Sequence, residues 1–244
     1  MMRDLSIPER IAQVKAAGMD GVEFWSWENK DTAELKDGAK QHGIEIAAFC
    51  TRFCSLVDPQ RRAEYLEGLK ASIPIARELN CTNLITQTGA ELPDVSREDQ
   101  KESLIAGLRE CVPLLEENGI TLLVEPLNIL VDHKGYFLYR SEEAFEIIRA
   151  VDSPYVKVLY DVYHQQITEG NLIPTIQENI DLIGHFHVAD HPGRTEPGTG
   201  EINYRRVFEA IAETGYDGWV GMEFRPTIAA VDALRQVVAL AEGL

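Results

Sequence analysis

The feature that most constrains the fold is a repeated junction at which a polar helical pattern ends and an apolar run begins within a few residues. Four of these junctions carry a glycine, at Gly18, Gly43, Gly119 and Gly215, and Asn80 takes the same place before a fifth apolar run. Both residue types tolerate the left-handed conformation that ends many helices. Helices that lead repeatedly into strands predict an alternating α/β chain built on a parallel sheet or barrel.

The pattern predicts seven strands and eight helices. The strands are 22–25, 44–50, 83–89, 121–127, 156–161, 183–190 and 219–224, and the helices are 8–17, 31–41, 61–79, 96–117, 141–150, 172–179, 205–214 and 230–242. A TIM (β/α)8 barrel needs a strand before its first helix, and only the segment MMRDL stands there. We therefore predict a TIM barrel whose first strand is missing or truncated. Because open strand edges favour aggregation, an abbreviated start or a partner element, as in a homo-oligomer, should fill the gap.

The length and the net charge of the chain limit the number of domains and the kinds of partner that it can have. The 244 residues show no linker and suit one barrel domain, 1–244. The formal charge of −17 opposes binding to nucleic acid or to an anionic membrane, so a small polar molecule is the expected partner. No signal-like or membrane-spanning apolar run is seen, so we expect a cytoplasmic protein. The 4 cysteines lack the paired spacing of a zinc site or a disulfide framework and are expected to be reduced thiols.

Four ionisable residues lie in otherwise apolar strand patterns, near the ends where TIM-barrel enzymes keep their chemistry. They are Glu125, Asp161, His187 and Glu223. A buried charge without a partner is costly, and one divalent cation would serve all four residues. Oxygen and imidazole ligands suit Mg²⁺ or Mn²⁺, with Co²⁺ or Zn²⁺ as alternatives. The competing interpretation is a set of unrelated buried ion pairs with Lys or Arg.

The segment HFHVADHPGRTEPGTGEINY, residues 185–204, combines an apolar strand with a polar loop. Its first two histidines alternate with apolar residues and therefore share one face of the strand. We interpret the segment as the floor and lip of an active site, with His187 as a ligand and His185 in a structural or supporting role. The alternative is a buried, hydrogen-bonded histidine pair beside a solvated loop.

Three further residues are candidates for substrate contact. Trp25 could wall the pocket or belong to the core. Glu23 could face the barrel interior and bind a histidine or the substrate, or pair with a cation. Arg194 offers a planar fork to a carboxylate or a hydroxyl pair, unless it pairs with Glu196 or Glu201 instead.

Several segments spread along the chain carry a resemblance to a known family. They are GVEFWSW at 21–27, VEPLN at 124–128, HKGYFL at 133–138, YDVYHQQ at 160–166, GHFHVAD at 184–190, PGRTEPGTGEINY at 192–204 and GMEFRP at 221–226. On these segments the chain resembles the xylose-isomerase-like family of metal-dependent sugar isomerases and epimerases, and within it the hydroxypyruvate-isomerase-like branch. The resemblance implies an eight-stranded barrel with metal ligands at Glu125, Asp161, His187 and Glu223, both glutamates as acid and base, and substrate contacts at His164 and Arg194.

The resemblance implies an isomerase that moves a proton beside a carbonyl through an enediolate. The expected reaction converts hydroxypyruvate to tartronate semialdehyde (2-hydroxy-3-oxopropanoate). A ketose 3-epimerase of the D-tagatose or D-psicose type is the first alternative, since those enzymes resemble this chain in carrying His at position 187. Two other classes remain: a multi-zinc nuclease, which the charge of −17 disfavours, and a non-catalytic ligand-binding relic of the barrel.

Overall fold

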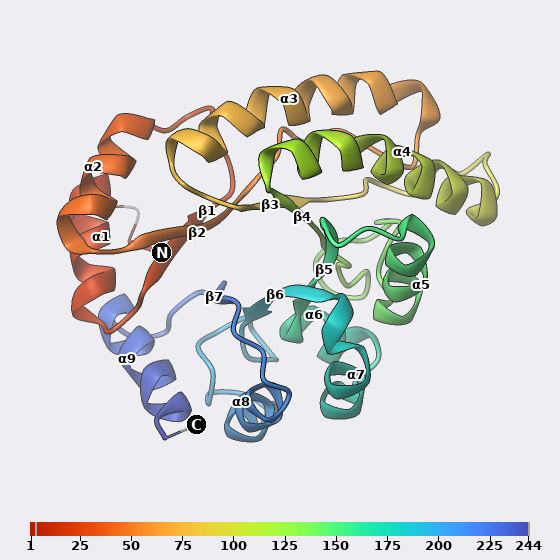
Figure 1. Cartoon of the computed structure of the whole chain (residues 1–244). Coiled ribbons are helices and arrows are strands. Elements are labelled where there is room, and N and C mark those ends of the chain that lie inside the picture. The colour runs from red at the N-terminus through yellow and green to blue at the C-terminus, as the bar shows by residue number, and fades with distance from the viewer. Residues whose placement is uncertain (3, 244) are drawn as a thin grey trace.

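The computed structural model describes residues 1–2 and 4–243, which form seven strands and nine α-helices that alternate along most of the chain (Figure 1). The strands are β1 (Gly21–Phe24), β2 (Glu45–Cys50), β3 (Asn83–Thr86), β4 (Thr121–Val124), β5 (Val156–Asp161), β6 (Ile183–Val188) and β7 (Val220–Met222). The α-helices are α1 (Ile7–Ala16), α2 (Thr32–His42), α3 (Arg62–Glu78), α4 (Arg97–Asn118), α5 (Ser141–Val151), α6 (Val162–Thr168), α7 (Leu172–Asn179), α8 (Tyr204–Glu213) and α9 (Ala230–Ala241). Two short 3-10 helices are η1 (Pro59–Arg61) and η2 (Ile180–Leu182). None of the described helices is long and apolar enough to cross a membrane.

All seven strands are parallel and each pairs with the next one in the sequence, in the order β1 to β7. The strands curve around a common centre and the helices lie outside them (Figure 1). This arrangement confirms the predicted TIM barrel. Among the described residues no strand precedes α1, and none pairs with the outer edge of β1 or β7, so the first strand is missing as predicted. A partner element in that gap stays a prediction.

The gap between β1 and β7, which we call the seam, is crossed by side chains and by the outer helices. Helix α1 packs against α9 as well as α2, and Arg235 of α9 donates to the carbonyl oxygen of Ala16 at 3.4 Å. A Cβ atom at Gly21 would lie only 2.8 Å from the ring of Trp219, which shows that this ring occupies the seam beside β1. The ring of helices is therefore continuous where the sheet is open.

The burial pattern explains why the strand ends carry the polar side chains. Strands of a parallel barrel are buried on both faces, and successive residues alternate between the interior and the helix layer. Leu123 and Leu159 belong to the small cluster of interior residues, which also contains Ala48 and Ile85. Two positions further along, the same face continues into Glu125 and Asp161. The alternation that places leucines inside the barrel thus places carboxylates at its mouth.

The predicted elements differ from the structure in two ways. The predicted strands at 83–89, 121–127, 183–190 and 219–224 run too far, because β3, β4, β6 and β7 end at Thr86, Val124, Val188 and Met222. Just past β4 and β7 one backbone hydrogen bond continues the ladder, from Glu125 N–H to the Thr86 carbonyl at 3.2 Å and from Glu223 N–H to the Val188 carbonyl at 3.2 Å. The helix α6 was not predicted. Asp161 ends β5 and also caps α6, with its Oδ1 accepting from the Tyr163 N–H at 2.8 Å.

Candidate metal centre

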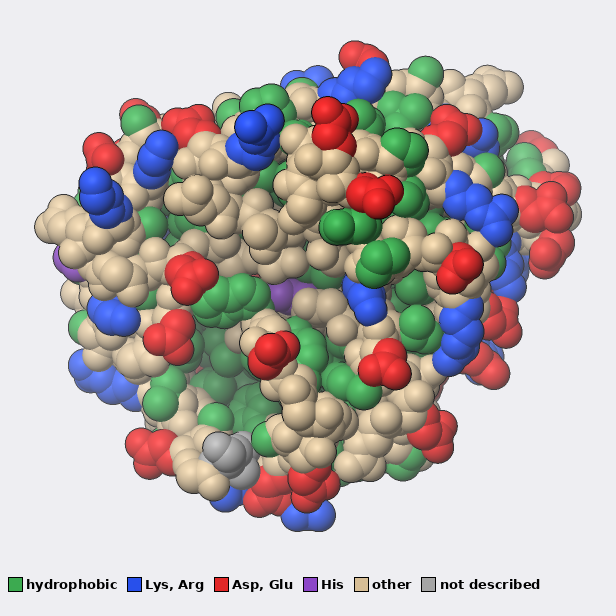
Figure 2. All heavy atoms as spheres, viewed as in Figure 1, with side chains coloured by type: hydrophobic (Ala, Val, Ile, Leu, Met, Phe, Trp, Pro, Cys, Tyr) green, Lys and Arg blue, Asp and Glu red, His purple; other side chains and the backbone are tan. Residues whose placement is uncertain are grey.

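Four polar side chains meet at the mouth of the barrel, and each comes from a different strand end. Glu125, Asp161, His187 and Glu223 each offer one ligand atom, and these atoms all lie within 4.8 Å of one another. Figure 2, in the same view as Figure 1, shows histidine atoms recessed near the centre of the face, among hydrophobic side chains. The structure therefore brings together the four residues that the sequence pattern selected as ligands.

The donor atoms of this cluster fit a divalent cation. Glu125 Oε1, Asp161 Oδ2 and His187 Nδ1 are buried and have no hydrogen-bond partner. His187 Nδ1 lies 3.4 Å from Glu223 Oε2 and 3.6 Å from Glu125 Oε1. Unpartnered buried polar atoms are costly, and one ion in contact with them would remove that cost. Three carboxylates and one imidazole suit a hard or borderline divalent ion.

The electrostatics of the cluster show an excess of negative charge. Burial alone would lower the pKa of His187, but the charges of Glu23 and Glu223 raise this pKa well above its ordinary value. Burial likewise opposes ionisation of Glu223, yet the charges of His187 and Arg194 lower its pKa to about 2. For Asp161 burial outweighs the charge of Arg194, so its pKa is raised. A site that stabilises an imidazolium so strongly attracts cations in general.

Arg194 closes one side of the cluster. Its Nη2 lies 2.5 Å from Glu223 Oε2 and 3.5 Å from Asp161 Oδ2. Among the described residues no ion pair joins Arg194 to Glu196 or Glu201, so the alternative pairing considered from the sequence is wrong. The guanidinium is fixed by the cluster itself and remains next to any molecule that enters it.

His164 lies in the first turn of α6 and is fully buried. Its Nδ1 accepts a hydrogen bond from the backbone N–H of Asn128 at 3.2 Å. Its Nε2 has no hydrogen-bond partner and lies 3.6 Å from Asp161 Oδ2. Burial lowers the pKa of His164 to about 4. The imidazole is therefore neutral near pH 7, with its hydrogen on Nε2, which makes it a donor directed at the cluster.

Three residues behind His164 were not selected from the sequence. The side-chain amide of Asn128 donates to Asp132 Oδ2 at 2.8 Å, and the Tyr163 hydroxyl donates to the same oxygen at 2.8 Å. Arg194 lies over the Tyr163 ring, 5.0 Å from its centroid. This network supports both His164 and Arg194 from behind. Asn128 could have been found, because it is a polar residue just after an apolar strand, as Glu125 is.

Strand β1 and the residue that follows it each direct one side chain to the cluster. The indole N–H of Trp25 donates to Glu223 Oε1 at 2.7 Å, although the residue is 65% exposed. The interpretation of Trp25 as a core residue is therefore wrong. Glu23 lies between two histidines, with Oε2 3.1 Å from His185 Nε2 and Oε1 3.2 Å from His187 Nε2. Its partner is a histidine pair rather than a lysine or an arginine.

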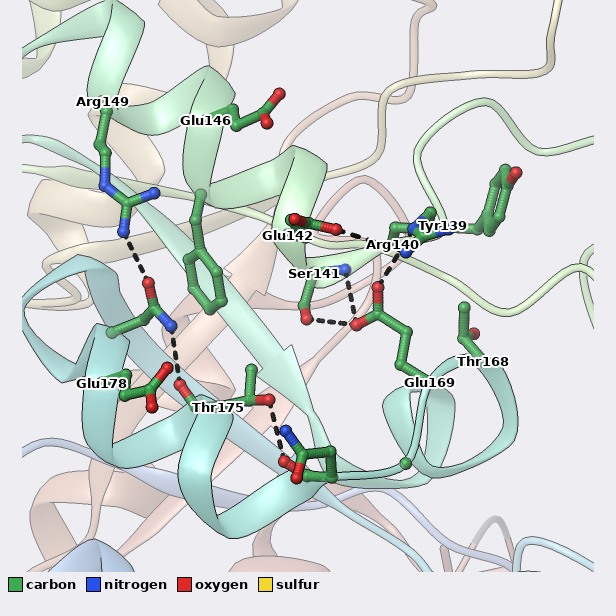
Figure 3. A pocket seen from close by; sticks show the side chains of 14 residues that line it. Tyr139, Arg140, Ser141, Glu142, Glu146, Arg149, Thr168, Glu169, Thr175 and Glu178 are labelled. Atoms are coloured by element: carbon green, nitrogen blue, oxygen red, sulfur yellow. Dashed lines mark hydrogen bonds and ion pairs between the residues drawn. The ribbon is translucent and has the colours of Figure 1, made fainter.

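A separate pocket lies outside the barrel, between α5 and α7 (Figure 3). It has a volume of about 720 Å³, and its polar groups bind one another. Glu169 accepts from the Ser141 hydroxyl at 2.5 Å, and Arg149 donates to Asn179 at 2.6 Å. No residue of the metal-ligand cluster lines this pocket, so its size does not make it a competing active site.

Comparison with known proteins supports the same fold and enzyme class. The family model of the xylose isomerase-like TIM barrel matches residues 11–241. The hydroxypyruvate isomerase of Escherichia coli (strain K12) is 34% identical over 235 residues, which cover 93% of this chain and 90% of the relative. The 2-oxo-tetronate isomerase of Cupriavidus necator is 31% identical over 234 residues, with coverage of 93% and 90%.

A solved structure is also similar over nearly the whole chain. It is that of an AP endonuclease, family 2, from Brucella melitensis, with a TM-score of 0.91, 29% identity and coverage of 98% of this chain and 95% of that one. The relatives from Escherichia coli and Cupriavidus necator are both isomerases by name, which confirms the predicted enzyme class. Because the family model matches nearly the whole chain, the protein belongs to the xylose isomerase-like TIM barrel family.

Proposed function

We propose that the chain is a Mg²⁺- or Mn²⁺-dependent isomerase that interconverts hydroxypyruvate and tartronate semialdehyde. The observation that carries this proposal is the convergence of Glu125, Asp161, His187 and Glu223 within 4.8 Å, in contact with Arg194. The reaction needs a proton acceptor, a proton donor, a group that stabilises negative charge on oxygen, and a cation for the substrate carboxylate. The described residues at the barrel mouth include a candidate for each role.

The reaction moves one proton between neighbouring carbons. A base removes a proton from C3 of hydroxypyruvate, an enediolate forms, and a proton returns to C2, while the hydroxyl proton moves from O3 to O2. Glu125 and Glu223 stand on different strands and are the proposed base and acid. The pKa of Glu223, lowered to about 2, keeps this carboxylate ionised near neutral pH, the state that a metal ligand or a base must have. When bound, a divalent cation supplies Lewis-acid stabilisation of the negative charge on the substrate oxygens.

Two side chains are suited to hold the substrate. Arg194 presents a planar cation, which binds carboxylates in a two-point geometry. His164 has an unpartnered Nε2 and can donate to a substrate oxygen. Trp25, which is 65% exposed beside Glu223, is placed to cover a bound molecule and limit access of water. Hydroxypyruvate and 2-oxo-tetronate, the molecules in the names of the two relatives, are both 2-oxo acids with a hydroxyl group at C3. This shared chemistry supports an acid rather than a neutral sugar as the substrate.

The test is a substrate comparison with Mg²⁺ or Mn²⁺ present. We expect kcat/KM for hydroxypyruvate to exceed that for free D-tagatose, D-psicose and D-fructose, measured by NMR of the products. Activity should disappear after chelation and return with the metal. Faster deuterium exchange at C3 of a ketose than at C3 of hydroxypyruvate would instead establish the 3-epimerase, which the resemblance at His187 favours. If the metal-loaded protein acts neither on hydroxypyruvate nor on the ketoses, the chain is a non-catalytic, ligand-binding barrel.

A nuclease is the remaining alternative, since a similar structure carries the name AP endonuclease. Phosphate backbones bind through Lys and Arg, whereas this chain has 23 of these residues against 40 Asp and Glu. Three of the four candidate ligands are carboxylates, a donor set that suits Mg²⁺ or Mn²⁺. A small-molecule substrate therefore has better support than DNA.

A further inference from the structure

Strand β1 lies at the open edge of the sheet, yet its side chains reach the centre of the candidate site. No backbone pairing joins β1 to β7 among the described residues. Glu23 nevertheless lies 3.1 Å from His185 Nε2 and 3.2 Å from His187 Nε2, on β6. The seam is bordered by β1 on one side and by β7 on the other, and β6 is the next strand after β7. The Glu23 side chain, which starts on β1, therefore crosses the seam to reach β6.

Gly221 makes this contact possible. A Cβ atom at this position would lie 2.2 Å from Glu23 Oε1 and 2.8 Å from the Cδ2 atom of His187. Both distances are too short for any side chain at this position. The backbone of Gly221 does not have a positive φ, so its conformation would suit other residues. The glycine is therefore needed for the space it leaves, through which the Glu23 carboxylate meets the His187 ring.

The contact determines which nitrogen of His187 carries the hydrogen when a metal is bound. Glu23 Oε1 and His187 Nε2 form an ion pair at 3.2 Å and are not in hydrogen-bond geometry. Because an ionised carboxylate has no hydrogen to donate, its negative charge favours the tautomer that carries the hydrogen on Nε2. A neutral imidazole carries a single N–H, which leaves a lone pair on Nδ1. That atom faces Glu125 and Glu223 at 3.6 and 3.4 Å. The ring is thus oriented with its free lone pair directed into the cluster.

We propose that Glu23 is a positioning residue for the metal centre: through the space left by Gly221 it fixes the orientation and tautomer of His187, so that Nδ1 is the ligand atom. Trp25 acts in parallel, because its N–H holds Glu223 Oε1 at 2.7 Å. Strand β1 and the residue that follows it therefore orient two candidate ligands from across the seam, His187 by the ion pair with Glu23 and Glu223 by the hydrogen bond from Trp25. Carboxylates that hold a metal-binding histidine in this way commonly change metal affinity about 10- to 100-fold when removed.

The same geometry allows one competing interpretation. Glu23, His185 and His187 also offer ligand atoms within 4.8 Å of one another and could hold a second cation. In that case Glu23 would be a ligand and would not fix the His187 tautomer. The two interpretations differ in the number of ions that the chain binds.

The experiment measures Mn²⁺ binding by electron paramagnetic resonance in the full chain and in Glu23→Gln. Glu45→Gln, an exposed residue on β2, is the matched control for loss of one carboxylate. We expect one strong site in the parent, affinity about 10- to 100-fold weaker in Glu23→Gln, and no change in Glu45→Gln. Gly221→Ala should reproduce the defect with Glu23 still present, because the new methyl group displaces the carboxylate.

A second readout does not depend on affinity or turnover. In Mg²⁺-saturated protein, ¹⁵N NMR of the histidine rings should show His187 with a protonated Nε2 in the parent and the control. In Glu23→Gln the amide can donate as well as accept, so the other tautomer should become populated. Parental affinity together with a single Nε2–H tautomer in Glu23→Gln would overturn the proposal. Two Mn²⁺ ions per chain, with one lost in Glu23→Gln, would also overturn it, because Glu23 would then be a ligand.

The inference rests on the metal centre of the proposed function and not on its substrate. If Glu23→Gln binds Mn²⁺ more weakly but the parent does not isomerise hydroxypyruvate, the positioning role stands and the substrate assignment fails. If the parent isomerises hydroxypyruvate with Mn²⁺ and Glu23→Gln keeps parental affinity and tautomer, the function stands and the positioning role fails.

Discussion

The two sides of this barrel support the same site in different ways. On the closed side, β4 and β5 have paired neighbours on both edges, and Leu122 and Val158 are fully buried. On the open side, each described residue of β1 and β7 is only partly buried, and the outer edges are unpaired. Both sides carry a glutamate of the cluster: Glu125 follows β4 and Glu223 follows β7.

The difference shows that one candidate ligand is supported mainly by the backbone of its strand, and the other by the backbone together with neighbouring side chains. Glu125 follows a strand that the backbone ladder holds on both edges. Glu223 follows a short edge strand that is paired on one edge only, and its side chain also receives hydrogen bonds from Trp25 and Arg194. We therefore expect changes on the closed side to act mainly on stability, and changes around the seam to act mainly on the alignment of the site.

The largest effect should come from removing the two proposed proton-transfer groups, one from each side. Glu125→Gln and Glu223→Gln keep the side-chain size and remove the charge, so each should lower kcat by about 10²- to 10⁴-fold with the fold intact. Steady-state kinetics on hydroxypyruvate with saturating Mn²⁺ measure this, with Glu45→Gln as the control. Turnover within a few-fold of the parent in either variant would exclude that residue from proton transfer.

The second prediction compares the stability of the two sides directly. Leu122→Ala removes a fully buried side chain from β4 and should reduce the free energy of unfolding by about 2–5 kcal/mol. Val220→Ala, in the half-buried β7, should cost about 1 kcal/mol. Urea unfolding monitored by circular dichroism measures both. Equal losses in the two variants would contradict the distinction between a closed and an open side.

The third prediction concerns how a bound metal ion changes the stability of the open side relative to the closed side. A ligand that binds only the folded state stabilises it by about 2.7 kcal/mol at 100 times its dissociation constant. Saturating Mn²⁺ should therefore raise the melting temperature. Amide exchange should slow more in β7 and β1 than in β4, because the ion ties Glu223 and His187 to the closed side. Equal slowing in all strands would show that the seam is not the more mobile part of the barrel.

The smallest effect concerns substrate recognition at the edge of the open side. Arg194→Lys keeps the positive charge but loses the planar two-point contact. Loss of one charge-assisted hydrogen bond should raise KM for hydroxypyruvate about tenfold, with a smaller change for a ketose. Arg206→Lys, on the exposed surface of α8, is the control. An equal rise in KM for both substrates would mean that Arg194 does not bind the carboxylate.

Much of the fold could be predicted because it depends on local sequence. Glycines at 43 and 119 end α2 and α4 in the left-handed conformation, and short apolar runs follow them. The strand limits were less accurate, since a strand ends where its partner ends, and the partner lies elsewhere in the chain. Helix α6 was not predicted because its cap, Asp161, is also the last residue of a strand.

For the site, the sequence by itself determined which residues carry the charge. Ionisable groups in apolar strand patterns pointed to Glu125, Asp161, His187 and Glu223, since the alternation of a strand and the cost of burying charge are properties of the local chain. Only the tertiary structure decided what these groups contact. Glu23 meets His185 across 162 positions of sequence, and Trp25 meets Glu223 across 198. Such partners depend on how the barrel closes around its seam, and no local pattern of residues records that geometry.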